Sequence, residues 1–341
     1  LQDVVMMARF RMLFLLAGLG AFAAASAAPA PPPILAPFFH DGSFEPGDYG
    51  FVRSAFPGAT AQQVADWKAI KAYGKACMQN AALVQDAELK KLGIIASVPK
   101  DRGYQDRLCS QILNVISAPE GFANWEAFRT ALSRSLPYFQ TYEAGITASV
   151  NAIQEAEENT LEEEATARII PDQAWRGPLG METLDTLSGV DADTLRMLKN
   201  RTVHRFEDVD WDNSHWVRHL LDTKGWSAVI KAGPRTAKMV WLIVQHADED
   251  PAFQAKALRQ LAPYVRAGKF NRPDYALLTD GVMLATTGKQ HYGSQLSCQN
   301  HYYAPRSLDA GGDDPKTLDK RRAEMGLFSE ATYLTYLPPH C

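Results

Sequence analysis

The sequence predicts an all-α protein in two parts, an N-terminal helical bundle over residues 61–160 and a C-terminal helical domain over residues 161–341. In the first part, apolar residues recur at intervals of three and four, and no alternating pattern typical of a strand competes with them. In the second part, Pro, Asp, Ser and Gly separate a series of helical segments. Residues 288–313 lack this periodicity and are rich in Gly, Tyr, Gln and Asn, which predicts one long irregular polar loop.

Residues 1–28 have the pattern of a secretory signal peptide. Arg9 and Arg11 precede an apolar run of about 13 residues, and Ala25-Ser26-Ala27 supplies the small residues that cleavage requires. The alternative is a membrane anchor, but a spanning helix needs about 20 apolar residues. We therefore expect an exported protein, periplasmic or secreted, with no transmembrane segment in the mature chain.

The first part of the mature chain, residues 29–60, is rich in Pro, Gly and aromatic residues and begins with APAPPPILAP. Such a stretch cannot continue a regular helix or sheet. It predicts an extended segment that lies on the surface. The bundle that follows ends in the acidic run EAEENTLEEEATAR, residues 155–168. We interpret this run as a solvated helix surface that marks a boundary near residue 160; the alternative is a site for a cation or a basic partner.

The four cysteines predict two disulfide bonds, because export places the chain in an oxidising compartment. Three pairings are possible. We favour Cys77 with Cys109 and Cys298 with Cys341, since each pair then falls within one predicted part. A zinc site is the competing interpretation, but no C-x-x-C spacing supports it.

Helix starts in the C-terminal part are predicted from N-cap residues, often with Pro at the first helical position. We expect such starts at the following places: Asp212-Asn213-Ser214, for a helix that runs to Thr223, then Gly233-Pro234, Asp250-Pro251, Asp274, Asp314-Pro315 and Ser329.

Composition and motifs exclude several classes of function. Lys and Arg number 35 against 39 Asp and Glu, for a net charge of −4, whereas nucleic-acid binding needs clustered positive charge. The sequence contains no G-x-S-x-G motif, no P-loop and no dinucleotide-binding fingerprint. We expect no nucleic-acid partner and no cofactor.

The strongest candidate for chemistry is QHADED, residues 245–250, where a predicted helix ends and the next begins. His246 is the natural acid/base group, because an imidazole titrates near neutral pH. Asp248 is close enough in sequence to orient the ring, and Gln245 adds an amide for substrate binding. The structural alternative is that His246 only interacts with the helix dipole and that Asp250 only caps the next helix.

A second group of candidates comes from the predicted loop and the helices beside it. Gln290, Tyr292 and Gln295 flank Gly293, and their polar groups suggest a hydrogen-bonding surface. Asp280 and Arg322 could point to the same place. We expect these five side chains to bind substrate. The alternatives are that the two Gln residues lock the loop and that Asp280 and Arg322 form an internal salt bridge.

Two patterns resemble metal sites. His246, Asp248 and Asp250 offer a nitrogen and two carboxylates, but nothing in the sequence enforces their convergence. His215 and His219 have the spacing of the zinc-protease motif, yet Trp216 stands where that motif requires Glu. The sequence therefore predicts no metal site.

The C-terminal half resembles a bacterial family of unknown function over about residues 165–336. The resemblance implies membership in that family and no particular activity. One departure is Gly281, where the family usually has an Arg. The matching motifs, in order, are Asp172-Gln173-x-x-Arg176, Asp212-Asn213, Trp241-x-Ile243-Val244-Gln245-His246-Ala247-Asp248-x-Asp250, Ala276-Leu277-Leu278-Thr279-Asp280, Gln290-x-Tyr292-Gly293-Ser294-Gln295 and Asp319-x-Arg321-Arg322-x-x-x-Gly326-Leu327.

Together these features predict an exported envelope protein whose C-terminal domain forms a polar pocket. It would act as a hydrolase or group-transfer enzyme on a small polar ligand or cell-envelope component, with His246 as acid/base. The alternative is a non-catalytic module that binds a ligand or has a structural role in the envelope. The two differ in whether the polar side chains converge on an open cavity.

Overall fold

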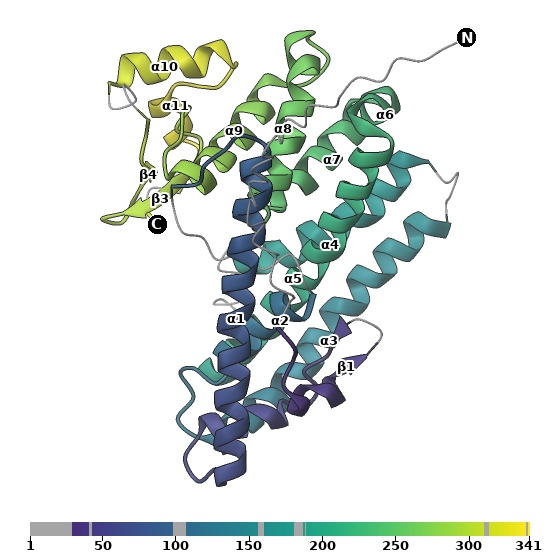
Figure 1. The fold of residues 1–341 in the computed structure, drawn as a ribbon, viewed down its shortest axis with the longest axis vertical. Coiled ribbons are helices and arrows are strands. Elements are labelled where there is room, and N and C mark those ends of the chain that lie inside the picture. Colours follow the sequence, from purple (N-terminus) through teal and green to yellow (C-terminus); the bar gives the residue numbers. More distant parts are fainter. Residues whose placement is uncertain are drawn as a thin grey trace, which may run out of the picture.

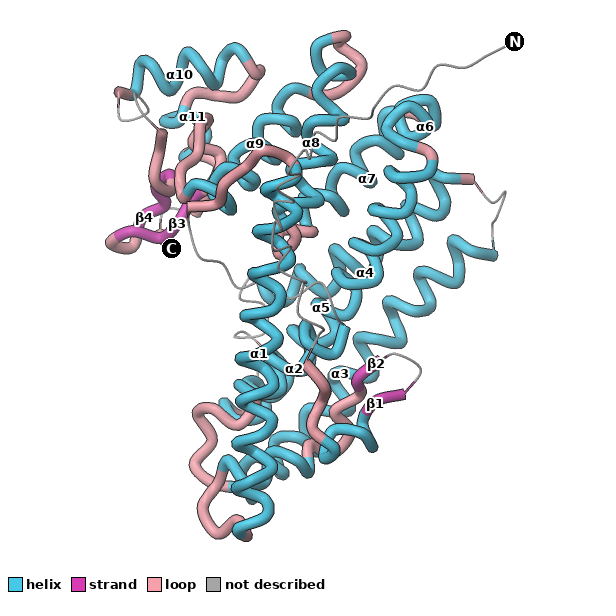
Figure 2. The backbone as a smooth tube through the Cα atoms, in the orientation of Figure 1, coloured by secondary structure: helices cyan, strands magenta, loops and turns pink. Residues whose placement is uncertain are grey.

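The computed structural model describes residues 29–40, 43–97, 107–155, 160–180, 187, 189–309, 314–338 and 340–341. The predicted signal peptide, residues 1–28, lies outside this set. Helices dominate, and the strands form two short hairpins, which confirms the all-α class (Figure 2). No helix in the described ranges combines the length and the apolarity that crossing a bilayer requires.

The segment that precedes the bundle is folded into its core, so the expectation of an extended surface segment is wrong. It contains the 3₁₀ helices η1 (Pro33–Phe38) and η2 (Gly50–Ala55) and the hairpin strands β1 (Phe39–His40) and β2 (Ser43–Phe44). Phe44, Tyr49 and Val52 are fully buried. Its aromatic side chains pack between the long helices, because burying them has a more favourable free energy than leaving them exposed to water in an extended segment.

The N-terminal bundle consists of α1 (Ala61–Lys91), α2 (Arg107–Ser117) and α3 (Trp125–Glu155), all within the predicted helical part. Thr60 and Gln63 form a reciprocal capping box at the start of α1. At Gly74, a Cβ atom would lie 2.5 Å from Cδ1 of Ile116, so any larger residue there would require the Ile116 side chain to move. Figure 1 shows α1 running along the molecule toward α8 and α9.

Both favoured disulfide bonds are present. Cys77–Cys109 joins α1 to α2 in the core, with a Cα–Cα distance of 5.4 Å. Cys298–Cys341 joins an exposed hairpin to the last residue, with a Cα–Cα distance of 5.6 Å. Each bond lies within one of the two predicted parts of the chain, as expected.

Replacing both Cys77 and Cys109 with Ala should lower the free energy of unfolding by about 3 kcal/mol, because the bond closes a long loop within the core. The matched variant, with Cys298 and Cys341 changed to Ala, opens a longer loop but should lose less, since that exposed edge can unfold locally. Urea titration measures both losses. Equal losses would show that loop length, and not the position in the core, governs the effect.

Two long helices connect the halves. α4 (Leu161–Gly180) packs on α3, and α5 (Ala192–Thr223) packs on α2, α3, α4 and α7. α5 begins after Asp191, whose side chain caps it, and continues without a break past Asp212. The expected helix start at Asp212-Asn213-Ser214 is therefore wrong. Asn213 and Ser214 are buried within α5, and packing against neighbouring helices overrides their local capping tendency.

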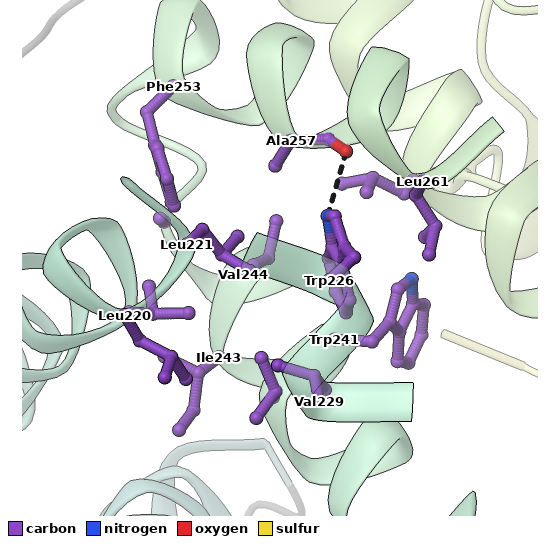
Figure 3. Packing of buried hydrophobic residues seen from close by; sticks show 14 of the residues in the cluster. Leu220, Leu221, Trp226, Val229, Trp241, Ile243, Val244, Phe253, Ala257 and Leu261 are labelled. Carbon is purple, nitrogen blue, oxygen red and sulfur yellow. Dashed lines mark hydrogen bonds between the residues drawn. The ribbon is translucent and has the colours of Figure 1, made fainter. Parts of the chain in front are cut away.

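The C-terminal core is formed by α6 (Gly225–Ala232), α7 (Pro234–His246), α8 (Pro251–Arg266) and α9 (Arg272–Thr287). Figure 3 shows Trp226 between these helices, donating a hydrogen bond from Nε1 to the Ala257 carbonyl at 3.1 Å. The predicted starts at Pro234 and Asp250-Pro251 are confirmed. For α9 the cap is Asn271, three residues before the expected Asp274.

The segment after α9 contains a hairpin within its irregular course. Strands β3 (Leu296–Gln299) and β4 (Tyr302–Pro305) pair antiparallel, with Cys298 opposite Tyr303. Asn300 and His301, both with positive φ, form the turn. α10 (Pro315–Glu324) and α11 (Glu330–Leu334) follow, and their predicted caps, Asp314 and Ser329, are confirmed.

Candidate functional site

The candidate site centres on His246, the last residue of α7. Its Nδ1 atom lies 2.9 Å from each carboxylate oxygen of Asp172, which α4 contributes. The Asp172 side chain is fully buried, whereas 19% of the His246 side chain is exposed. A buried carboxylate thus holds one edge of a ring whose other edge faces outward, which is the arrangement of an oriented acid/base histidine.

Asp172 is kept ionised by its neighbours. Burial alone would raise the pKa of its carboxyl, but the hydrogen bond and charge of His246, with Arg176 and Gln173, outweigh burial and lower that pKa. Arg176 Nε lies 3.6 Å from Asp172, one helical turn away, and Gln173 Nε2 donates at 2.6 Å. An ionised Asp172 favours the ring tautomer with the proton on Nδ1.

Arg176 connects this pair to α5. Its Nη2 atom donates to both carboxylate oxygens of Asp210, at 2.5 and 2.7 Å. Burial raises the pKa of Asp210 well above its usual value, and the negative charges of Asp172 and Asp248 add to that effect, while Arg176 opposes it. The carboxylate that contacts Nδ1 of the His246 ring is that of Asp172.

The Nε2 atom of His246 makes no hydrogen bond to any described residue, so it is the atom that a substrate or water could reach. With Nδ1–H donated to Asp172, Nε2 has a free lone pair and can accept a proton. The arrangement can take up a proton and return it at one position.

Gln245 lies beside α9. Its Nε2 atom is 3.5 Å from the position that a Cβ atom would take at Gly281, so the missing side chain at that position makes room for this amide. Its Oε1 atom is buried and has no hydrogen-bond partner among the described residues. Gln245 therefore occupies a packing position between α7 and α9.

The loop candidates converge on the loop backbone. Asp280 accepts hydrogen bonds from the backbone amides of His291, Tyr292 and Ser294, at 2.8 to 2.9 Å. Arg322 donates to the carbonyls of Tyr292, Gly293 and Phe328. Both side chains are buried. The Asp280 carboxylate thus accepts hydrogen bonds from the loop backbone, and the Arg322 guanidinium donates hydrogen bonds both to the loop and to the segment after α10.

Gln290 and Gln295 also hold the loop in place through hydrogen bonds. Gln290 Nε2 donates to the carbonyls of Gln295 and Arg306, and its Oε1 accepts from the Gln295 amide. Gln295 Nε2 reaches the Leu277 carbonyl at 3.4 Å. Tyr292 packs edge-on against His291, and burial raises the pKa of its hydroxyl. Within the described residues, no hydrogen bond or ion pair joins these side chains to His246.

Asp250 and His215, one from each of the two metal-like patterns, have other partners. Asp250 caps α8 and is bound by Gln85 and Arg218. His215 Nδ1 contacts the Trp211 carbonyl at 2.8 Å, and the two rings stack. In the part of the chain that the structure describes, three or more His, Cys, Asp or Glu side chains nowhere gather as metal ligands would.

The sequence did not identify Asp172 as the partner of His246, since 74 residues separate them. One local signal was present. Asp172 and Arg176 have the i, i+4 spacing that places two side chains on one helix face, where a carboxylate and a guanidinium can act together.

The site and its scaffold define an all-α protein with a histidine–aspartate pair between two helices. Residues 200–339 match the model of a family of unknown function, DUF6624. The match contains His246 and the loop, whereas Asp172 and Arg176 lie before it. Comparisons with curated proteins and with solved structures found no match.

Proposed function

We propose that this is an exported envelope protein in which His246 acts as a general acid/base in hydrolysis or group transfer on a polar envelope molecule. The observation that carries the proposal is the 2.9 Å contact between Nδ1 of His246 and the buried Asp172 carboxylate, with no protein partner for Nε2 among the described residues. Asp172 is a positioning residue, because it acts through the ring. The predicted signal peptide and the two disulfide bonds support export.

The second candidate is a non-catalytic binding or structural module. It is favoured by the backbone contacts of Asp280, Gln290 and Arg322, which use those side chains to lock the loop. We therefore propose no substrate contact for these three residues.

The test is hydrolysis of isolated peptidoglycan and of p-nitrophenyl acetate, phosphate and N-acetylglucosaminide by the full chain. Changing His246 to Gln should lower the rate on the responsive compound by at least about 100-fold, the contribution typical of a general acid/base. His219→Gln, an exposed histidine of α5, is the matched control and should retain the rate.

The Asp172→Asn variant tests whether Asp172 positions the His246 ring or only stabilises the fold. It should lower the maximal rate more than the apparent affinity and change the pH profile of the rate, because the ring loses its charge partner. Turnover that persists in His246→Gln would show that His246 is not the acid/base group, and no turnover of any compound by the wild type would favour the non-catalytic alternative.

A further inference from the structure

A cavity, separate from the His246 cluster, lies between α3, α4 and α5. Its volume is about 480 Å³, within the range of small-ligand sites. One part of its wall is apolar and includes Val150, Ile153 and Val209, while Glu164, Arg168 and Asp212 supply charge. Figure 1 shows these three helices side by side. The cavity combines both signs of charge with an apolar surface.

Arg168 is the feature of this cavity that internal contacts do not explain. Its guanidinium lies 4.8 Å from the centre of the Trp216 ring. Its Nε atom is buried without a hydrogen-bond partner, and no ion pair joins its side chain to another described residue. A guanidinium has five N–H donors in a planar fork, and leaving the buried one on Nε unmatched beside a cavity is unfavourable. A carboxylate from outside the chain would match them.

Three carboxylates line the same space, and one of them, that of Glu163, accepts a hydrogen bond from the Thr160 backbone amide. Trp216 donates its Nε1 hydrogen to Oε1 of Glu164, so one indole positions both Glu164 and Arg168. Asp212 is half exposed and lies 3.3 Å from Nη1 of Arg107. Burial lowers the pKa of Arg168, while the charges of Glu164 and Asp212 oppose that effect, so all three groups share one electrostatic environment. A purely anionic ligand would be repelled by these acids, and a purely cationic one by Arg168.

We propose that this cavity binds a zwitterionic ligand, a free amino acid or short peptide with an apolar side chain. Its carboxylate pairs with Arg168, its ammonium group lies near Glu164 and Asp212, and its side chain packs on Val150, Ile153 and Val209. A bidentate guanidinium–carboxylate pair gives orientation, and the acids select against ligands that lack a positive charge. The inference does not depend on catalysis at His246.

The test is isothermal titration of the full chain with leucine and with leucyl-leucine, each compared with its N-acetyl and its C-amide form. At least one parent compound should bind, and each blocked form should bind at least about tenfold more weakly, since it loses a charge-assisted contact. Arg168→Met should weaken the parent compound by about 30-fold and leave the C-amide form nearly unchanged. Arg235→Met, an exposed arginine of α7 outside the cavity, is the control.

Asp212→Asn provides a second variant if Arg168→Met folds poorly. It should weaken the parent compound but not its N-acetyl form, because only the parent carries the ammonium group. The proposal is overturned if neither parent compound binds at millimolar concentration, or if the blocked forms bind equally well. It is also overturned if both cavity variants retain wild-type affinity.

Discussion

Asp280→Ala should lower the free energy of unfolding by about 4 kcal/mol, which is the largest loss we expect from a single substitution. The variant leaves three buried backbone amides, those of His291, Tyr292 and Ser294, without their acceptor. A buried donor without a partner costs about 1–3 kcal/mol, and the three losses are not fully additive. The loss is large because a single side chain accepts all three of these hydrogen bonds.

Urea titration measures this loss, and hydrogen exchange at the three amides locates it. Their protection should fall more than that of amides in α7. Asp274→Ala, on the first turn of the same helix, removes a carboxylate that pairs with half-exposed Lys238, and it should cost within about 1 kcal/mol. If the two variants lost the same stability, Asp280 would not be what holds the loop.

Glu207→Gln should stabilise the protein at neutral and alkaline pH, by about 3 kcal/mol at pH 8. Burial on α5, with the nearby charge of Glu249, raises the pKa of Glu207 from 4.5 to about 8. Each unit of pKa difference corresponds to about 1.4 kcal/mol. We expect less than the full amount, because part of the side chain still contacts solvent.

The direction follows from proton binding in the two states. The folded pKa of Glu207 lies above the unfolded one, so its contribution is fully present below about pH 4.5 and is lost as pH rises toward 8. Gln resembles the protonated acid and does not ionise. The variant should therefore match the wild type at pH 4 and exceed it increasingly from pH 5 to pH 8.

Unfolding measured at a series of pH values gives this difference directly. Glu126→Gln, an exposed glutamate on the first turn of α3, is the control and should show no such growth with pH. A constant difference between Glu207→Gln and the wild type across the pH range would mean that Glu207 ionises normally in the folded protein.

Helix starts were predictable where local chemistry alone decides them. Pro234, Pro251 and Pro315 begin helices because a fixed φ and a missing N–H suit the first helical position. The same kind of signal failed at Asp212-Asn213-Ser214, since α5 continues through it and buries Asn213 and Ser214. Local capping energies of about 1 kcal/mol are smaller than the packing energy of a long helix.

The loop around residues 290–295 shows how much of a candidate site can be predicted from the sequence. The residue types at Gln290, Tyr292 and Gln295 suggested hydrogen bonding, and hydrogen bonding is what the two glutamines do. Whether their partners are a ligand or the loop's own backbone depends on the position of α9 and α10 around the loop. Only the tertiary structure could decide between these two uses.

The sequence by itself determined the all-α class, the main helix starts, the number of disulfide bonds and His246 as a group to examine, because short-range periodicity, capping residues and the cysteine count are enough to predict them. The tertiary structure decided the burial of Phe44 and Tyr49 and the pairing of His246 with Asp172. It also decided the placing of Arg168 in a cavity. These depend on contacts between residues far apart in the chain, and local pattern carries no information on which distant side chains will meet.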